Sequence, residues 1–321
     1  MTVERISIGT RGSKLALWQA HHIKSQLTSR FPSLSVEIRI IKTLGDKILD
    51  SALSKIGDKG LFTKEIEHAL LAGEIDLAVH SLKDIPTKLP DGLIIGAVTE
   101  REDVRDVFLA HPRLSNTRFA ELPQGATIAT GSLRRACQIL SHRPDLRIVD
   151  IRGNLNTRIE KFEQSDWHGM ILAKAGLTRL GLEERISEVL SPMFMLPAVG
   201  QGALGIEVRG DDTNIRDLVH HLHHEPTAVA VTCERALLRR LEGGCQIPIG
   251  TYGRLETGEL RIDAMVGSLD GTKIVRGTAS GKPEEAETLG SALAEQLLNR
   301  GGREILDAIL SGTRNVRQPE A

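Results

Sequence analysis

Segments of strand length alternate with segments of helical periodicity in the first part of the chain. Arg5–Gly9 has the apolar pattern of a short strand, and Ser13–Arg30 carries apolar residues at helical spacing. Ser35–Ile41 then alternates polar and apolar residues, as a strand does. This order predicts strand–helix–strand units, and such units build a mostly parallel sheet with helices on its faces.

The same alternation continues further along. A stretch rich in glycine and lysine at 42–60 predicts a long, mobile loop, which a helix at Thr63–Leu71 and a buried strand at Asp76–His80 follow. A second series predicts strands at 127–130, 146–151 and 169–173, each followed by a helix, and an apolar strand ends the segment Leu196–Arg209. We therefore expect an α/β fold with two doubly wound domains.

The pattern changes at Thr227. A long helix at Thr227–Glu242 precedes three alternating strands, at 251–255, 261–266 and 273–278, and two helical stretches, at 284–299 and 303–310. This order predicts a smaller α+β domain at the C-terminal end of the chain.

Overall charge and cysteine usage exclude several classes of function. The formal net charge is −1, so bulk attraction to nucleic acid or to an anionic membrane is not expected. No apolar stretch approaches the roughly 20 residues that span a bilayer, and the N-terminus has no signal-peptide core. The three cysteines, Cys137, Cys233 and Cys245, are far apart in sequence. We expect a reducing, cytoplasmic compartment.

Arginines recur where a predicted strand ends and a helix begins. Ligands of open α/β sheets bind at this edge, where helix N-termini attract anions and arginine adds bidentate recognition of carboxylates. Any one of these arginines is more simply a solvated surface residue, but six at equivalent positions predict a polyanion site. They are Arg11, Arg134, Arg135, Arg152, Arg158 and Arg179.

One carboxylate follows the buried strand that ends near His80. Asp84 stands beside Lys83 in the segment HSLKDIPT and would stay ionised among cations. It could stabilise a developing cation or move a proton, although Asp84 taken alone is more simply a loop-capping residue. No phosphate-binding glycine motif opens a helix, so nucleotide binding is not favoured.

Eight segments occur in an order that resembles one family. They are RGSKLALWQA, GLFTKEIE, HSLKDIPT, TGSLRRACQ, IRGNLNTR, AGLTRLG, VGQGALGIE and GGCQIPIG. Together they resemble the porphobilinogen deaminases, or hydroxymethylbilane synthases, from about residue 5 to about residue 310. The resemblance implies a transferase that adds four porphobilinogen molecules to a dipyrromethane cofactor, with loss of ammonia, and then releases linear hydroxymethylbilane by hydrolysis.

The resemblance also assigns residues. It implies that Cys245 carries the cofactor through a thioether and that Asp84 is the catalytic aspartate, which stabilises positive charge on the pyrrole and assists proton transfer. Lys59 and Phe62 would contact the pyrroles from the lid at 42–60. The cofactor and substrate carboxylates would be bound by Arg11, Ser13, Ser81, Lys83, Thr130, Ser132, Arg134, Arg135, Arg152, Gly153, Arg158, Arg179, Gln201 and Ala203.

The implied architecture is that of periplasmic binding proteins, with two doubly wound domains around a cleft. Domain 1 would comprise 1–102 and 201–222, domain 2 would comprise 103–200, and domain 3 would comprise 223–321. Crossings near Thr99–Arg105 and Met195–Gln201 would join the first two domains and allow the cleft to adjust. A monomer is expected, and its product would pass to uroporphyrinogen-III synthase.

Two alternatives stay open at this point. The chain could be a small-anion-binding protein of the solute-binding type without catalysis, or a transferase that uses Cys245 as its turnover nucleophile. The histidines at His220–His224 have spacings that could bind a metal, but no carboxylate or cysteine completes a set, so we expect none. The role of Lys174 is open.

Overall fold

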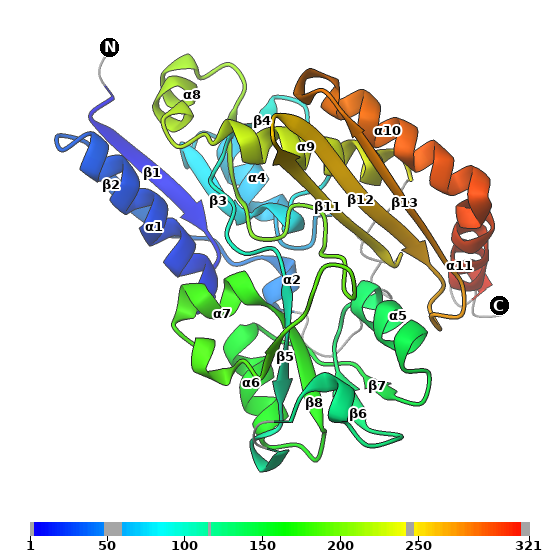
Figure 1. The fold of residues 1–321 in the computed structure, drawn as a ribbon. Coiled ribbons are helices and arrows are strands. Elements are labelled where there is room, and N and C mark those ends of the chain that lie inside the picture. Colours follow the sequence, from blue (N-terminus) through cyan, green and yellow to red (C-terminus); the bar gives the residue numbers. More distant parts are fainter. Residues whose placement is uncertain (1–2, 48–59, 115–116, 242–246, 316–321) are drawn as a thin grey trace, which may run out of the picture.

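The computed structural model describes residues 3–47, 60–114, 117–241 and 247–315. The strands of these residues form two five-stranded sheets and one three-stranded sheet. Figure 1 shows the first sheet at the upper left, the second at the bottom, and the third at the right. The predicted α/β fold with a smaller C-terminal unit is therefore confirmed, whereas the exact domain boundaries stay a prediction.

The first sheet has the strand order β2-β1-β3-β10-β4. Its helix α1 begins after Ser13, whose hydroxyl accepts a hydrogen bond from the backbone N–H of Ala16 at 3.3 Å. Ile23 and Leu27, four residues apart on α1, are fully buried against the sheet. The elements of this unit are β1 (Arg5–Thr10), α1 (Lys14–Arg30), β2 (Ser35–Ile40), α2 (Leu44–Lys47), α4 (Lys64–Leu71), β3 (Leu77–Ser81), β4 (Leu93–Val98), β10 (Leu204–Arg209) and α8 (Thr213–His220).

The second sheet has the order β7-β6-β8-β5-β9. Apolar side chains cover both of its faces, as in the first sheet, because helices and loops pack on either side. Its elements are β5 (Asp106–Ala110), β6 (Thr127–Ala129), α5 (Leu133–His142), β7 (Arg147–Val149), α6 (Leu155–Glu163), β8 (Gly169–Ala173), α7 (Lys174–Leu180) and β9 (Glu188–Val189). Helix α7 of this unit contacts α1 of the first (Figure 1).

One strand in each large sheet runs against its neighbours. β10 is antiparallel to β3 and β4, and β5 is antiparallel to β8 and β9. Each is the first strand after the chain passes from one sheet to the other, at 99–105 and again at 190–203. The remaining pairs are parallel, so the prediction of mostly parallel sheets is confirmed.

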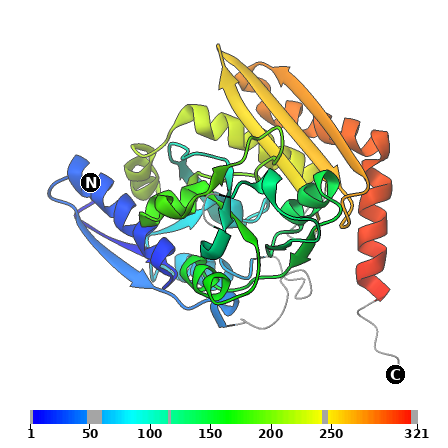
Figure 2. The ribbon, with the colours of Figure 1, turned by 60° about the horizontal axis from the view of Figure 1, so that its bottom comes forward.

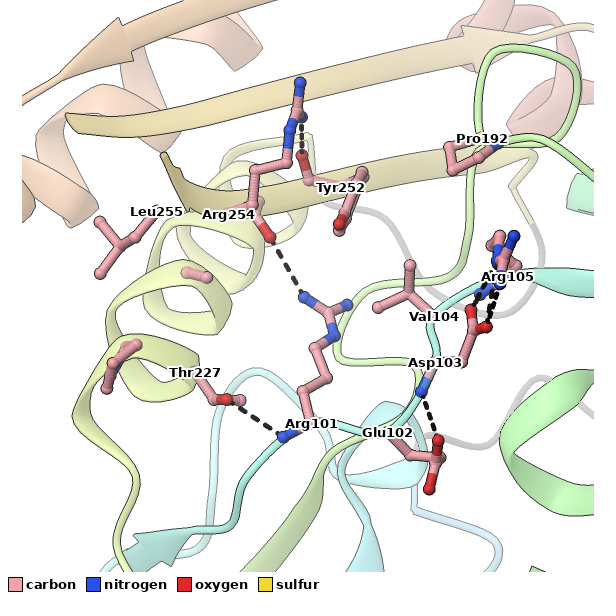
Figure 3. A pocket seen from close by; sticks show the side chains of 13 residues that line it. Arg101, Glu102, Asp103, Val104, Arg105, Pro192, Thr227, Tyr252, Arg254 and Leu255 are labelled. Atoms are coloured by element: carbon pink, nitrogen blue, oxygen red, sulfur yellow. Dashed lines mark hydrogen bonds and ion pairs between the residues drawn. The ribbon is translucent and has the colours of Figure 1, made fainter. Parts of the chain in front are cut away.

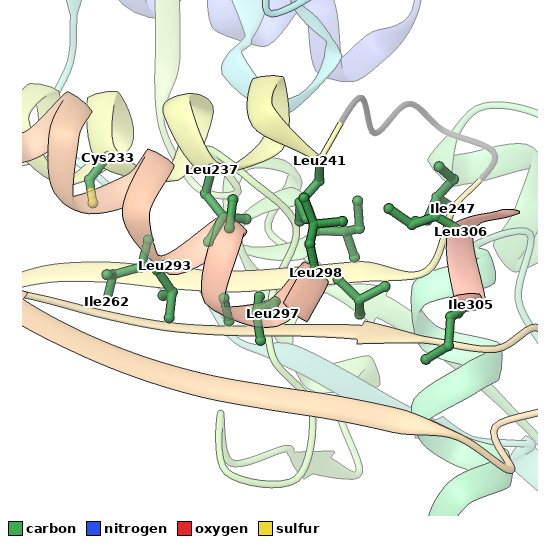
Figure 4. Close-up of a cluster of buried hydrophobic side chains, with 14 of the residues drawn as sticks. Cys233, Leu237, Leu241, Ile247, Ile262, Leu293, Leu297, Leu298, Ile305 and Leu306 are labelled. Carbon is green, nitrogen blue, oxygen red and sulfur yellow. The ribbon is translucent and has the colours of Figure 1, made fainter. Parts of the chain in front are cut away.

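The third unit is an antiparallel sheet covered by helices. Alternate residues of β12, including Ile262, point into a core that Leu237, Leu293 and Leu297 complete (Figure 4). Figure 2 shows α11 at the end of the molecule opposite to α1. The elements are α9 (Glu225–Arg240), β11 (Ile249–Glu256), β12 (Glu259–Gly267), β13 (Ile274–Gly281), α10 (Ala286–Leu297) and α11 (Arg303–Asn315).

The sequence patterns missed β4, β5, β9 and α8 and assigned the whole of 42–60 to a loop. The loop prediction was wrong for its first part, because Leu44–Lys47 forms α2. Two contacts hold this turn: Asp46 accepts a hydrogen bond from the Thr43 hydroxyl at 2.8 Å, and the backbone N–H of Gly45 donates to the Leu61 carbonyl at 2.9 Å. The part of the predicted lid at 48–59 lies outside the described residues.

Candidate active site

Asp84 lies in a short turn at the carboxyl end of β3. Leu82–Asp84 form a 3-10 helix, in which Leu82 is buried while Lys83 and Asp84 are exposed. The backbone N–H of Leu82 donates to the carbonyl of Ala203 at 3.0 Å, which ties the turn to the second crossing. The fold thus places Asp84 at the sheet edge where ligands of α/β proteins bind.

Asp84 shares a pocket with residues of β3 and α1, of the turn after β1 and of the turn before α4. Arg11, Ser13, Phe62 and Ser81 line this pocket together with Asp84. The amide of Gln19 also lines it and donates to the Ser81 hydroxyl at 2.8 Å. The structure therefore brings together five of the predicted site residues that are far apart in sequence.

Arg11 already contacts a carboxylate of the chain. Its Nε lies 3.1 Å from Oδ1 of Asp46, and its guanidinium stacks 4.2 Å from the centroid of the Phe62 ring. Burial opposes ionisation of Asp46, but the hydrogen bonds and charge of Arg11 outweigh it and lower the pKa of this carboxyl. Asp46 thus occupies the guanidinium of Arg11, which the sequence predicts to bind ligand carboxylates.

Arg134 and Arg135 meet one buried aspartate. Their guanidinium groups donate to the two oxygens of Asp106, at 2.7 Å and 2.9 Å, and Asp106 has no exposed surface. Burial opposes ionisation, but the two cations outweigh it and lower the pKa of Asp106. The amide of Gln201 adds a hydrogen bond to Asp106 at 2.9 Å and one to the Val104 carbonyl at 2.7 Å. Asp106 therefore holds the start of α5 and both crossings together.

Cations of the second unit face Lys83 and Asp84 of the first. Desolvation by the surrounding protein lowers the pKa of Lys83, although the side chain is solvent-accessible; Asp84 opposes this effect, and Arg135 adds to it. Burial lowers the pKa of Arg158 to about 10, with repulsion from Arg135 and Arg152 next in size. At neutral pH a guanidinium of this pKa stays charged. The region thus carries positive charge that the protein's own carboxylates do not fully balance.

The turn before α6 shows why glycine stands beside these arginines. Gly153 has a φ of +117°, a conformation that residues with a side chain rarely adopt, and its carbonyl accepts a hydrogen bond from Nε of Arg158 at 2.8 Å. Nε of Arg152 lies 3.2 Å from Asp150. The Thr130 hydroxyl accepts from the backbone N–H of Ser132 at 3.2 Å, just before α5. These contacts orient the turns, and their ligand contacts stay a prediction.

Arg179 links the second unit to the crossing and to α1. It donates to the carbonyl of Gly202 at 2.6 Å, and its guanidinium lies 5.8 Å from the ring centroid of Trp18. Burial lowers its pKa to about 10, and Glu102 opposes this shift. Gln201 and Ala203 are buried in the crossing, so their side chains support the fold. Contact of either residue with a ligand stays a prediction.

Several predicted residues lie elsewhere. Cys245 and Lys59 lie outside the described residues. Lys174 donates to Asp103 at 2.9 Å, an ion pair at the first crossing. His224 pairs with Thr227 at 2.8 Å, and the ring of His223 accepts from the backbone N–H of Val98 at 3.3 Å. No cluster of metal-ligating side chains occurs within the described ranges.

Sequence reasoning missed the carboxylates that organise the arginines. Asp106 opens an apolar strand, DVFLA, and a charge at that place was a usable signal of a buried partner. Asp46 lay in the segment assigned to a loop. Glu234 of α9 accepts hydrogen bonds from Arg101 at 2.7 Å and from the backbone N–H groups of Gly200 and Gly253, both at 2.7 Å. Glu234 could not be identified from the sequence, because its partners are distant along the chain.

A more open pocket of about 460 Å³ lies where the first crossing meets α9 and β11 (Figure 3). Three arginines line it, but each is paired with a carboxylate of the chain. Arg101 binds Glu234, Arg105 binds Asp103 at 2.6 Å, and Arg254 binds Asp263 at 2.6 Å. These pairs leave less free positive charge than the Asp84 region has, so the Asp84 region is the better candidate for an anion site.

Fold and site together define an α/β protein with one exposed carboxylate among cations that face it from a second sheet. Comparison with known proteins narrows this class. Residues 6–217 match the family described as porphobilinogen deaminase, dipyromethane cofactor binding domain, and residues 228–299 match the porphobilinogen deaminase C-terminal domain. The chain belongs to the porphobilinogen deaminase family. None of the helices in the described ranges is both long and apolar enough to cross a membrane.

Relatives named porphobilinogen deaminase match along almost the whole chain. The protein of Chlorobaculum parvum is 55% identical over 94% of this chain and 97% of its own length. That of Syntrophomonas wolfei is 53% identical over 95% and 98%. Among solved structures, the periplasmic VFT2 domain of Bordetella pertussis BvgS matches 68% of this chain and 85% of its own, at 12% identity and a TM-score of 0.40. A likeness this slight supports no conclusion about function.

Proposed function

We propose that this member of the family is a transferase that joins four porphobilinogen molecules into linear hydroxymethylbilane, with loss of ammonia. Family membership over both matched regions supports the reaction. The observation that carries the proposal is that Asp84 lies near Arg158 and the adjacent Lys83 lies near Arg135, because the substrate bears two carboxylates and its reaction develops positive charge.

The residues present fit the family's dipyrromethane cofactor, which carries several carboxylates. The guanidinium Nε of Arg135 is buried and has no hydrogen-bond partner among the described residues, so one strong donor is free for an anion. Burial and repulsion from neighbouring arginines lower the pKa of Lys83 and of Arg158. A bound anion would relieve this repulsion, so the arrangement favours anion binding. When bound, the cofactor supplies the pyrrole carbon to which substrate is added.

We assign the following tasks to the chain's own residues. Arginines of the second unit bind carboxylates and fix the ligand against the β3 turn. Asp84, ionised, stabilises positive charge on the substrate pyrrole N–H and assists movement of its proton. Phe62, beside Arg11, covers the pyrrole rings and limits access of water. The remaining carboxylate contacts come from Arg11, Ser13, Ser81, Lys83, Thr130, Ser132, Arg134, Arg152, Gly153, Arg179, Gln201 and Ala203.

Other parts of the proposal rest on the resemblance alone. Cys245 holds the cofactor through a thioether, and Lys59 approaches the pyrroles; both lie outside the described residues. The protein acts as a cytoplasmic monomer, and uroporphyrinogen-III synthase takes up its product.

A direct assay tests the proposal. Purified protein incubated with porphobilinogen should consume it and release ammonia in equal amounts, with a linear tetrapyrrole as product. A protein that binds porphobilinogen in equilibrium dialysis but leaves it unchanged would instead be an anion-binding protein.

A further inference from the structure

A buried histidine with two glutamates lies behind the Asp84 pocket, and the proposed function leaves it unused. His80, on β3, is only 5% exposed, yet it lines the pocket with Ser81 and Asp84. Its Nε2 lies 3.0 Å from Oε2 of Glu207, whose side chain has no exposed surface. His80 therefore connects the pocket to a carboxylate that solvent does not reach.

Strand register places these groups on one face of the sheet. His80 pairs with Gly205 of β10, and Glu207 lies two residues further along β10, so its side chain points to the same face. Gly205 has no side chain between them. Helix α4 packs against β3 and β10 and carries Glu67, which is 4% exposed. The backbone alone thus holds the three residues in one layer.

The charges of the group are not balanced by ordinary ion pairs. Oε1 of Glu67 and Oε1 of Glu207 are buried, and neither has a hydrogen-bond partner among the described residues. Such oxygens are costly to bury when ionised. Burial raises the pKa of Glu67, and repulsion from Glu207 adds to this, whereas Thr63, His80 and His68 act in the opposite direction. A proton on Glu67 would remove one of the two buried carboxylate charges.

The other charged groups that face the cluster do not supply a partner. Arg235 of α9 interacts with Glu207 at longer range, but its guanidinium donates to the carbonyls of Ile85 and Pro86, at 3.1 Å and 2.6 Å. His68 acts on Glu67 from the same helix. Among the described residues, Glu207 is the one carboxylate hydrogen-bonded to His80.

We propose that Glu67, Glu207 and His80 form a proton-holding cluster of the active site. This proposal rests on the proposed function. Each addition breaks one C–H bond on a pyrrole carbon and one C–N bond of the substrate, while one C–C bond forms. The C–N bond breaks first and releases ammonia, and the C–H bond breaks after the C–C bond has formed, so that ammonia and the proton amount to one ammonium overall. The His80 imidazole accepts the C–H proton and passes it to solvent, Glu207 stabilises the resulting cation, and Glu67 stays protonated throughout.

The resting state of the cluster is tested without any activity. Infrared spectra in D₂O at neutral pH should show the C=O stretch of a protonated carboxyl in the native protein. Glu67→Gln should remove this band, and Glu74→Gln, at an exposed glutamate, should keep it. A native protein without the band, or a band that survives Glu67→Gln, overturns the proposal.

The proton-holding role is tested by the pH dependence of kcat. Glu207→Gln keeps a similar shape but weakens proton binding by the imidazole, so the acid limb of the kcat profile should move to lower pH. We expect kcat to fall about 100-fold and KM to change less than about twofold, with partial recovery in Glu207→Asp. His80→Asn should abolish that limb.

A merely structural cluster gives a different result. Glu207→Gln would then lower the melting temperature and reduce kcat at every pH without moving the limb, and this outcome contradicts the proposal. If the native protein consumes no porphobilinogen, the proposed function fails, while the infrared band still reports on the resting cluster.

Discussion

Asp46 holds the guanidinium of Arg11 through hydrogen bonds from Nε to both carboxylate oxygens, at 3.1 Å and 3.3 Å. Both side chains remain partly exposed, at 28% for Asp46 and 21% for Arg11. A carboxylate of the chain thus takes the position that we assign to a carboxylate of the ligand. A ligand carboxylate that binds the same Nε–Nη2 edge of Arg11 must displace Asp46.

Removal of the Asp46 charge should tighten the binding of porphobilinogen at Arg11. Asp46→Asn keeps the shape of the side chain but removes its charge. Because exposed pairs contribute up to about 1 kcal/mol, we expect KM for porphobilinogen to fall up to about fivefold. Asp91→Asn, at an exposed site, serves as the control. A rise in KM would mean that Asp46 orients Arg11 instead of competing for it.

Asp106→Asn should destabilise the protein strongly. It removes the only carboxylate hydrogen-bonded to Arg134 and Arg135 among the described residues, and breaking a buried pair costs about 3–5 kcal/mol. Urea unfolding at pH 7 measures this loss. Asp150, the partner of Arg152, is far more exposed than Asp106, so Asp150→Asn should cost less than about 1 kcal/mol. Equal losses in the two variants would refute the assigned importance of Asp106.

The effect of Asp106 should depend on pH in one direction. The pKa of Asp106 is lowered in the folded state, so its stabilising contribution is complete above the unfolded pKa of about 4 and is lost as the pH falls toward the folded value. The difference in unfolding free energy between the native protein and Asp106→Asn should therefore shrink below about pH 4. A difference that grows in acid would contradict this linkage.

Glu234→Gln should loosen the third unit from the crossings. Glu234 is fully buried and accepts hydrogen bonds from Arg101 and from two backbone N–H groups. The amide of glutamine has one acceptor oxygen instead of two, so it can accept fewer of these hydrogen bonds. We expect a loss of about 3 kcal/mol in the free energy of unfolding. Glu287→Gln, at an exposed ion pair, is the matched control and should change little.

Asp84→Asn should separate cofactor attachment from turnover. Asp84 is exposed and does not support the core, so the variant should fold and carry its cofactor. Turnover should fall by about 100-fold or more, because an amide cannot stabilise the cation or accept the proton. Unchanged turnover would show that Asp84 only shapes the β3 turn.

Most elements were predictable because local patterns determine them. The short apolar pattern of Arg5–Gly9 reflects a buried strand, the spacing in Ser13–Arg30 reflects one buried helix face, and both elements formed as expected. β5 was harder to predict, because it is short and the charged segment before it resembles a surface loop. Its burial depends on Arg134 and Arg135, about 30 residues away in sequence.

The site residues also divide into those that local sequence patterns reveal and those that depend on distant partners. Asp84 and the arginines could be found by their position after strands and by family resemblance. Asp46, Glu207 and Glu234 could not, because each acts on a partner that only the folded chain brings close. The residues proposed to bind a ligand could thus be identified in the sequence, whereas Asp46, Glu207 and Glu234 could not.

The intact mass of the purified protein under denaturing conditions tests the central claim most directly. The native chain should exceed its polypeptide mass by two linked pyrrole units, as should Cys137→Ser, and Cys245→Ser should not. A bare polypeptide mass that incubation with porphobilinogen leaves unchanged would contradict the assignment of this chain as a hydroxymethylbilane-forming transferase.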